Sequence, residues 1–275
     1  MSDGSQSEPA PPKPVTFLQF RQACSAGFRQ LHASKTCLVR IRSGSKRVRP
    51  VSGPEAFVTE GDFIYFRAGE ILTVENFIGA EGLYFSEGFI LEDAVVEDFL
   101  AAHPNPPGTS DARAGTMAPG FVEAFDHVVQ SLDDPALPDR FLTYRTHELL
   151  LWLQRAGVAH HLHSSDSLKS RLRKLFEQDV TRAWRAPEAA RELGMSEATL
   201  RRTLSKEDSG FSELLKDVRL SFALVLIQTT QMGLAEIAYA CGFSSQSRLS
   251  EAFKSRFDVP PGKLRASKVE LERIA

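Results

Sequence analysis

The sequence predicts an α+β protein of two domains, an N-terminal β domain that also carries helices and an all-helical C-terminal domain with two helix-turn-helix units. Three observations predict this. Short runs of β-branched and aromatic residues recur at intervals of roughly 8–12 residues in the first part of the chain. Helical spacing of apolar residues dominates from Leu168 onward. A helix–glycine–helix pattern then occurs twice, around Gly194 and Gly242.

Composition is that of a globular protein, with 275 residues, 42% hydrophobic and 25% charged. No apolar run reaches the roughly 18 residues of a membrane span, so we expect no membrane partner. The three cysteines, Cys24, Cys37 and Cys241, are odd in number and widely spaced, which argues against a disulfide framework and favours the cytoplasm. Residues 1–16 are polar and Pro-rich and are expected to be a disordered tail.

Charge is distributed unevenly along the chain. From Leu168 onward there are 19 basic and 14 acidic residues, against 14 basic and 21 acidic residues before it. The C-terminal part is therefore the part suited to a polyanion such as DNA.

Residues 17–157 are expected to form one regulatory and dimerisation domain. Segment 17–31 mixes apolar and polar residues and stays open between helix and strand. Clear strand patterns follow at 36–42, 56–59, 62–67, 71–78 and 82–86. Helical spacing predicts helices at 89–102, about 121–131 and 139–157.

The helix at 139–157 is strongly amphipathic. Its apolar residues are Phe141, Tyr144, Leu149, Leu151, Trp152 and Leu153. Two uses of this surface stay open: packing on its own domain, or a dimer interface.

The segment 158–167 is interpreted as a polar linker between the domains. It contains His160, His161 and His163, but a metal site would need further ligands in a fixed geometry. No cysteine or carboxylate lies within the cluster, so we expect no metal there.

The second helix-turn-helix covers Leu234–Leu249. Leu234, Ile237, Ala238 and Cys241 lie on one helical face, and Cys241 is expected to be a small core residue. Gly242 suits a sharp turn because glycine tolerates positive φ, and Phe243 fills the corner. Ser244 and Ser245 are candidate N-caps for the next helix.

The first unit, Pro187–Leu204, repeats this pattern 48 residues upstream, measured between the two turn glycines. Gly194 makes the turn, Met195 fills the corner and Ser196 caps the second helix. A single long helix over residues 210–229 is expected to join the two units. Residues 168–275 are therefore expected to form one domain that contains both helix-turn-helix units. Units of this kind place their second helix in the major groove of DNA.

Residues across this region resemble the AraC/XylS family of transcription regulators. The resemblance rests on Trp184, Leu193-Gly194, Ser196 and Arg202 in the first unit, Arg219-Leu220 in the long helix, and Glu236-Ile-Ala238, Gly242-Phe243, Phe253-Lys254, Phe257, Pro261 and Arg265 in the second. Departures from the family pattern are Arg248-Leu249 in place of an aromatic pair, Leu204 in place of Phe, Asp258 in place of Gly, and a shorter connector at 206–211.

The resemblance implies an activator of bacterial promoters whose two recognition helices enter successive major grooves, about 34 Å apart. It also implies a cupin-like fold for the N-terminal domain, a homodimer, contact with RNA polymerase, and control by a small effector or a partner protein. The general layout resembles regulators of type III secretion genes.

Candidate DNA-binding residues come from the two recognition helices. In the first, Arg201 and Arg202 are the strongest candidates because arginine reads guanine with two hydrogen bonds. Lys206, Arg248, Lys254 and Arg256 suit phosphates instead. The full set of candidates is Glu197, Ala198, Arg201, Arg202, Ser205, Lys206, Ser245, Gln246, Ser247, Ser250, Glu251 and Lys254.

Other classes of protein find little support in the sequence. The DNA-repair alkyl transferases that resemble this family need a four-cysteine zinc cluster, and the N-terminal half has only Cys24 and Cys37. Motifs of serine hydrolases, zinc proteases and phosphate-binding loops are absent, so neither an enzyme nor a cofactor is expected. Paired helical hairpins that bind protein rather than DNA remain an alternative.

Overall fold

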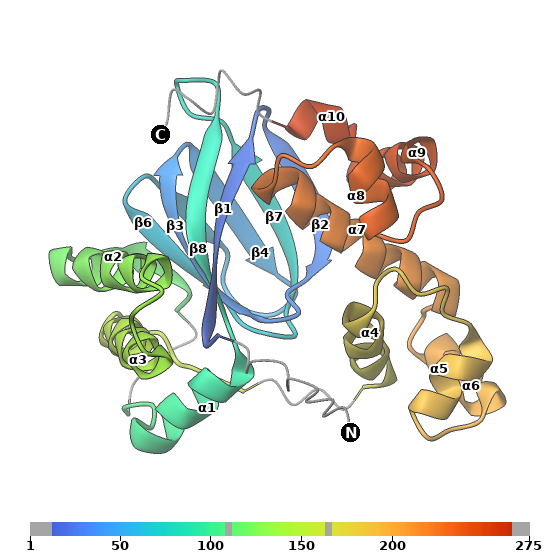
Figure 1. Cartoon of the computed structure of the whole chain (residues 1–275), viewed down its shortest axis with the longest axis horizontal. Coiled ribbons are helices and arrows are strands. Elements are labelled where there is room, and N and C mark those ends of the chain that lie inside the picture. The colour runs from blue at the N-terminus through green and yellow to red at the C-terminus, as the bar shows by residue number, and fades with distance from the viewer. Residues whose placement is uncertain (1–12, 108–111, 163–166, 266–275) are drawn as a thin grey trace, which may run out of the picture.

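The structure is a computed structural model that describes residues 13–107, 112–162 and 167–265. Two antiparallel sheets form the centre of the N-terminal domain, with helices α1–α3 on one side and the C-terminal helices on the other (Figure 1). The predicted two-domain α+β architecture is confirmed. Most of the expected tail, residues 1–12, lies outside the described residues, and the first strand already begins at Val15.

One sheet has the strand order β1-β8-β3-β6-β9 and the other β2-β7-β4-β5. The strands are β1 Val15–Gln22, β2 Ala26–His32, β3 Thr36–Ser43, β4 Ser45–Pro50, β5 Ala56–Thr59, β6 Asp62–Phe66, β7 Ile71–Phe77, β8 Tyr84–Leu91 and β9 Ala114–Thr116. Inward side chains of both sheets share a core, which is Val39, Ile41, Val48, Val58, Ile64, Leu72, Val74 and Tyr84.

Four of the expected strands are found nearly as predicted, at β3, β5, β6 and β7. The expected helix start at Phe89 is wrong, because Phe89 and Leu91 extend β8 and α1 begins only at Asp93. Segment 17–31, which sequence reasoning left open, is mostly strand, in β1 and β2. Strand β4 was not predicted at all.

Three helices cover the five-stranded sheet: α1 Asp93–Ala102, α2 Pro119–Asp133 and α3 Asp139–Arg155. Aromatic rings from sheet and helices interlock, as in the Phe89–Phe125 pair with centroids 4.4 Å apart. Buried Leu142, Leu149 and Leu153 place one face of α3 in this core. Helix α3 therefore packs on its own domain, which was one of the two alternatives, but this packing covers only part of the apolar surface of the helix.

The interpretation of 158–167 as a polar linker is wrong at its start. Val158, Ala159 and His160 are all buried in the N-terminal domain. The His160 ring lies between the Tyr65 hydroxyl and the Leu150 carbonyl, each 3.0 Å from one of its ring nitrogens. Burial lowers the pKa of His160 to about 4, so this histidine is a neutral core residue. His163 lies outside the described residues.

The C-terminal domain is all-helical, as predicted. Its helices are α4 Leu168–Gln178, α5 Ala186–Glu192, α6 Glu197–Lys206, α7 Phe211–Thr229, α8 Leu234–Ala240, α9 Gln246–Phe257 and α10 Pro261–Leu264. Helix α7 joins two separate cores, one around α4–α6 and one around α8–α10. No helix of the described residues has the length and apolar character to cross a membrane.

The N-terminal domain packs on the second of these cores. Phe28 of β2 is buried among residues of α7 to α10, with its ring 5.6 Å from that of Phe257. The amide of Ala23 also donates to the carbonyl of Leu264, at 2.9 Å. Among the described residues, the core of the first unit contains no residue from the N-terminal domain, and Figure 1 shows α5 and α6 away from the sheets.

Candidate nucleic-acid interface

The second helix-turn-helix consists of α8 and α9. Gly242 has φ +72°, and a Cβ there would lie 2.8 Å from the Val180 carbonyl oxygen and 2.7 Å from the Arg219 guanidinium. Both conformation and space therefore require glycine at this turn. Of the two candidate caps, Ser245 is the N-cap of α9, since its side chain accepts from the Arg248 amide.

The first unit, α5 and α6, has the same construction. Gly194 has φ +69°, and the Ser196 side chain accepts from the Thr199 amide at 3.1 Å. Unlike Gly242, Gly194 has open space where a Cβ would lie. The turn needs glycine here for its backbone conformation alone.

The α6 candidates lie on the outer surface of their helix. Leu200 and Leu204 are buried on the inner face, which fixes the helix rotation. The candidates on the outer side are Glu197, which is half-buried, and the exposed Ala198, Arg201, Arg202, Ser205 and Lys206. The structure thus brings all six to one accessible face.

Arg201 already has a partner on its own helix. Its guanidinium lies 2.7 Å from the Glu197 carboxylate, in an i,i+4 pair whose arginine side chain is 66% exposed. An exposed pair of this kind contributes only about 0.3–0.5 kcal/mol, so a stronger partner can replace the carboxylate. Arg202 is exposed too and forms no ion pair among the described residues.

The α9 candidates also face outward, above a buried face of Leu249, Ala252, Phe253 and Phe257. Gln246, Ser247, Glu251 and Lys254 are exposed, whereas Ser245 and Ser250 are half-buried. Each recognition helix therefore combines a fixed rotation with a polar outer surface.

Arg256, which was expected to contact phosphate, is engaged within the protein. It donates to the Asp217 carboxylate at 2.9 Å and to the backbone carbonyls of Arg29 and Gln30 of the N-terminal domain. The same Asp217 accepts from Arg173 of α4 at 2.6 Å. Arg256 thus connects the second recognition helix to β2 and α7 instead of presenting its charge to solvent.

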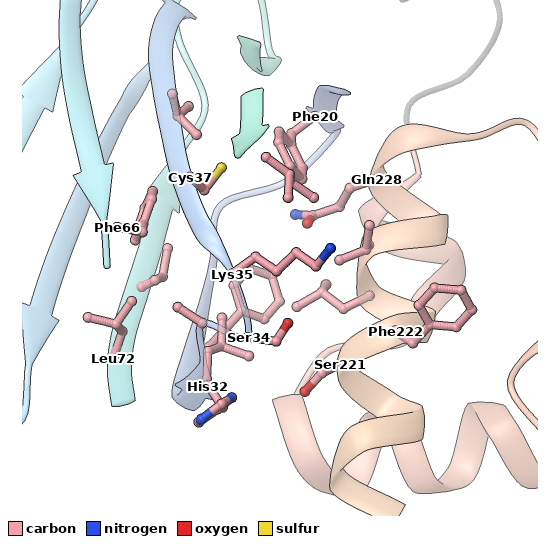
Figure 2. A pocket seen from close by; sticks show the side chains of 18 of the residues that line it. Phe20, His32, Ser34, Lys35, Cys37, Phe66, Leu72, Ser221, Phe222 and Gln228 are labelled. Carbon is pink, nitrogen blue, oxygen red and sulfur yellow. The ribbon is translucent and has the colours of Figure 1, made fainter. Parts of the chain in front are cut away.

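Sequence reasoning missed an interdomain cavity of about 510 Å³. Strands of the N-terminal domain form one wall and α7 the other (Figure 2). Most of the lining is apolar, with Phe20, Leu31, Val39, Phe66, Leu72 and Leu224 among its residues. No local pattern in the sequence could reveal it, because its walls are about 200 residues apart in the chain.

Lys46 and Arg173 are the buried charged residues among those that line this cavity, each with 7% of its surface exposed. The Lys46 ammonium donates to the Asn76 side chain at 2.7 Å and lies over the Tyr84 ring, and no carboxylate of the described residues forms an ion pair with it. Burial lowers the pKa of Lys46 to about 7. Glu92 and Glu177 also line the cavity, but neither forms an ion pair with Lys46. A buried lysine without a paired carboxylate is a candidate site for an anionic group.

Comparison with known proteins finds similarity mainly in the C-terminal part. A family profile described as a helix-turn-helix domain matches residues 189–267. The chain is 30% identical over 100 residues to the transcriptional activator PerA of Escherichia coli, which is 36% of either chain. It is 34% identical over 87 residues, 32% of either chain, to the TCP pilus virulence regulatory protein of Vibrio cholerae.

A longer match, 24% identical over 155 residues, joins 53% of this chain to 52% of the Salmonella regulator SirC. These alignments span about a third to a half of the relatives' own length. The resemblance to AraC-family regulators is confirmed by these matches.

Solved structures extend the likeness to the whole fold. Vibrio cholerae ToxT superposes with a TM-score of 0.64 at 17% identity, covering 90% of this chain and 95% of that one. This likeness confirms the fold of both domains, including the N-terminal β domain.

Proposed function

We propose, from the premise that the C-terminal helices form an AraC-type DNA-binding domain, that this chain is a sequence-specific transcription activator that reads two successive major grooves. One observation carries the proposal: α6 and α9 are both capped by serine, fixed in rotation by a buried apolar face, and polar on their outer faces. Two such helices, at the two ends of one rigid connecting helix, suit two adjacent half-sites on duplex DNA.

The roles of the contact residues follow from side-chain chemistry. Arg201 and Arg202 are assigned to base edges, where a two-hydrogen-bond contact with guanine is worth about 1–3 kcal/mol. Gln246, Ser247 and Glu251 are assigned to bases in the second groove. Lys206 and Lys254 are assigned to phosphates, which position the protein without reading sequence.

Selection of binding sites from randomised DNA tests this assignment. Wild-type protein should recover one sequence class, with affinity that falls steeply as salt rises. Arg201→Ala should relax the preference at one base position, while Arg155→Ala, on the exposed side of α3 in the other domain, should not. Binding without sequence preference in the wild type would overturn the proposed function.

We also propose that the chain forms a homodimer through α3. Besides its buried face, α3 exposes Phe141 at 44%, Tyr144 at 70% and Leu151 at 42%. These positions share one side of the helix, and an apolar stripe of this kind is typical of helix pairing. Sedimentation should detect a dimer that Tyr144→Glu weakens and that Tyr239→Glu, at an exposed tyrosine of α8, leaves unchanged.

The effector is proposed to be a small amphipathic carboxylate in the interdomain cavity. An unsaturated fatty acid is bound in one of the ToxT structures, which supports this choice together with the apolar lining and Lys46. A protein partner on the domain surface is the alternative. Titration calorimetry with oleate, and with methyl oleate as the uncharged control, separates the two.

The regulated genes are proposed to belong to virulence functions. Several relatives carry that description, including the virulence regulon activator VirF of Shigella flexneri. Type III secretion genes are the narrower expectation, with RNA polymerase as the protein partner at the promoter. Mapping the binding sites across the genome of the source organism tests both.

A further inference from the structure

Two charged residues of α7 lie where this helix passes from the core of the first helix-turn-helix unit to the core of the second. Val218 is the last α7 residue in the first core, and Leu220 is the first in the second core. Among the described residues, the two cores share no side chain. Apolar packing therefore holds each unit to α7 separately. Asp217 and Arg219, on either side of Val218, supply polar contacts between the units.

The Asp217 carboxylate binds to both units at once. Its Oδ2 accepts from Arg173 of α4, which packs with the first unit, at 2.6 Å, and its Oδ1 accepts from Arg256 of α9 at 2.9 Å. The Arg173 and Asp217 side chains are largely buried, so solvent screens this pair only in part. Arg256 is fixed further, because its two terminal nitrogens donate to the carbonyls of Arg29 and Gln30 of β2. One carboxylate thus connects α4, α7 and α9.

Arg219 makes a second connection on another side of α7. Its guanidinium donates to the carbonyls of Val180 and Arg182, at 3.1 and 2.8 Å, in the segment between α4 and α5. The same guanidinium lies against Gly242, at the turn of the second unit. Residues two positions apart on a helix point about 200° from each other, so Asp217 and Arg219 contact nearly opposite sides of α7. If one of these connections is lost, the second unit can turn about the other.

The contacts of Asp217 fix an angle between the units that apolar packing leaves free. Hydrophobic burial is not directional, whereas hydrogen bonds between charged groups are short and have a preferred geometry. A cleft of about 460 Å³ lies beside these contacts, and Asp217, Arg173 and Arg256 all line it. The two guanidinium groups therefore have space to separate once the carboxylate that joins them is removed.

We propose that Asp217 is a positioning residue that determines which spacing of the two half-sites the protein accepts, an inference that rests on the proposed function. It acts through Arg173 and Arg256, which hold the two units in one relative orientation. One base pair inserted between the half-sites moves them apart by about 3.4 Å and turns one relative to the other by about 35°. Units joined at Asp217 cannot follow this change without losing base contacts in one groove, whereas units released there follow part of it.

The test uses the full chain and the selected DNA site, rebuilt with one base pair inserted or removed between the two half-sites. Wild-type affinity should fall by about tenfold or more on either change, because the loss of one good base contact has an effect of this size. Asp217→Asn keeps the side-chain size but turns an amide donor towards one guanidinium, so its affinity should fall by less than about threefold on the same changes. Base preference within each half-site should stay as in the wild type. Glu213→Gln, the same chemical change at an exposed position of α7, should show the full wild-type loss.

The ratio of affinities between spacings separates positioning from a loss of stability. A variant that is merely less stable has a smaller folded fraction, which lowers binding to every spacing by the same factor and leaves the ratio unchanged. A wild-type ratio in Asp217→Asn would therefore overturn the inference. So would a wild-type protein that binds all three spacings equally well.

A second variant removes the partner of Asp217 on α4. Arg173→Met should relax the spacing preference in the same way as Asp217→Asn, and it decides the question if Asp217→Asn fails to fold. The double variant should relax the preference no further than either single variant, because both changes remove the same contact. Full addition of the two effects would contradict a shared role. Loss of sequence-selective DNA binding in the wild type would instead remove the proposed function itself.

Discussion

The two helix-turn-helix units share one construction but differ in what surrounds them. Each has a glycine at positive φ, a serine cap and an apolar inner face on its second helix. The second unit shares its core with Phe28 of the N-terminal domain, whereas the described core of the first unit is built from C-terminal residues alone. The two units therefore differ in their surroundings: the N-terminal domain packs against the second unit and contributes nothing to the described core of the first.

The largest expected effect comes from removing the shared residue. Phe28→Ala empties a fully buried site, and such truncations cost about 3–5 kcal/mol. Hydrogen exchange should show loss of protection in α8, α9 and β2 and little change in α5 and α6. Equal loss of protection in both units would contradict the difference between them.

Next in size is the contrast between the two turn glycines. Alanine at either position adopts an unfavourable left-handed conformation, at about 1–2 kcal/mol. Gly242→Ala must also displace the Arg219 guanidinium or the Val180 carbonyl, which adds about 1–3 kcal/mol. Urea unfolding should therefore rank Gly242→Ala as clearly less stable than Gly194→Ala, which has open space. The reverse order would mean that the two turns are not built as described.

A smaller effect concerns the dependence of stability on pH through Lys46, in the N-terminal domain. Burial lowers the pKa of Lys46 to about 7 from 10.5, so between these values the unfolded chain binds more protons than the folded one. Stability should thus rise with pH across that window, by up to about 1.4 kcal/mol per unit, and the contribution is lost as pH falls to 7.

Lys46→Met should remove this slope. Subtracting its profile from that of the wild type cancels the other ionisable groups around the cavity, which are His32, Lys35, Cys37, Glu92, Arg173 and Glu177. A difference that stays flat from pH 7 to 10 would show that Lys46 is solvated.

The smallest expected effect concerns a feature that the two helix-turn-helix units share, an aspartate with positive φ after the second helix. An aspartate with left-handed backbone follows each recognition helix, Asp208 with φ 47° after α6 and Asp258 with φ 59° after α9. Glycine is the residue that adopts this conformation without strain. Asp208→Gly and Asp258→Gly should each change the free energy of unfolding by about 0.5 kcal/mol or less in either direction, and by similar amounts. A large difference would reveal a contact made by only one of the aspartates.

Sequence reasoning succeeded where the signals are local. The glycine turns, the serine caps and the long helix α7 were all predicted from residues within a few positions of each other, and the structure confirms them. Asp258 explains one departure from the family pattern, because its backbone is left-handed where the family usually has Gly.

The failures are of another kind. Strand β4 was missed because one of its two inward positions holds Lys46 beside Val48, and its outward positions hold Arg47 and Arg49, which pair with Glu75 and Glu55. With Val48 as its one apolar inward residue, the strand shows too little alternation of apolar and polar residues to be predicted. His160 was assigned to a linker although its ring is enclosed by Tyr65 and Phe99. The cavity, and the buried hydrogen bond from Gln228 to Gln22, depend on residues about 200 positions apart, which periodicity in the sequence cannot reveal.

Phe28 has a consequence for how these regulators can be recombined. A domain boundary placed after α3 divides the chain, but it does not divide the hydrophobic cores. The Phe28 ring of the N-terminal segment is part of the core formed by α7–α10. A chimaera that joins α4–α10 to a foreign N-terminal domain would have a vacant site beside Phe257. Exchange of N-terminal domains between relatives should therefore succeed only when the incoming domain brings a bulky apolar residue to that place in its second strand.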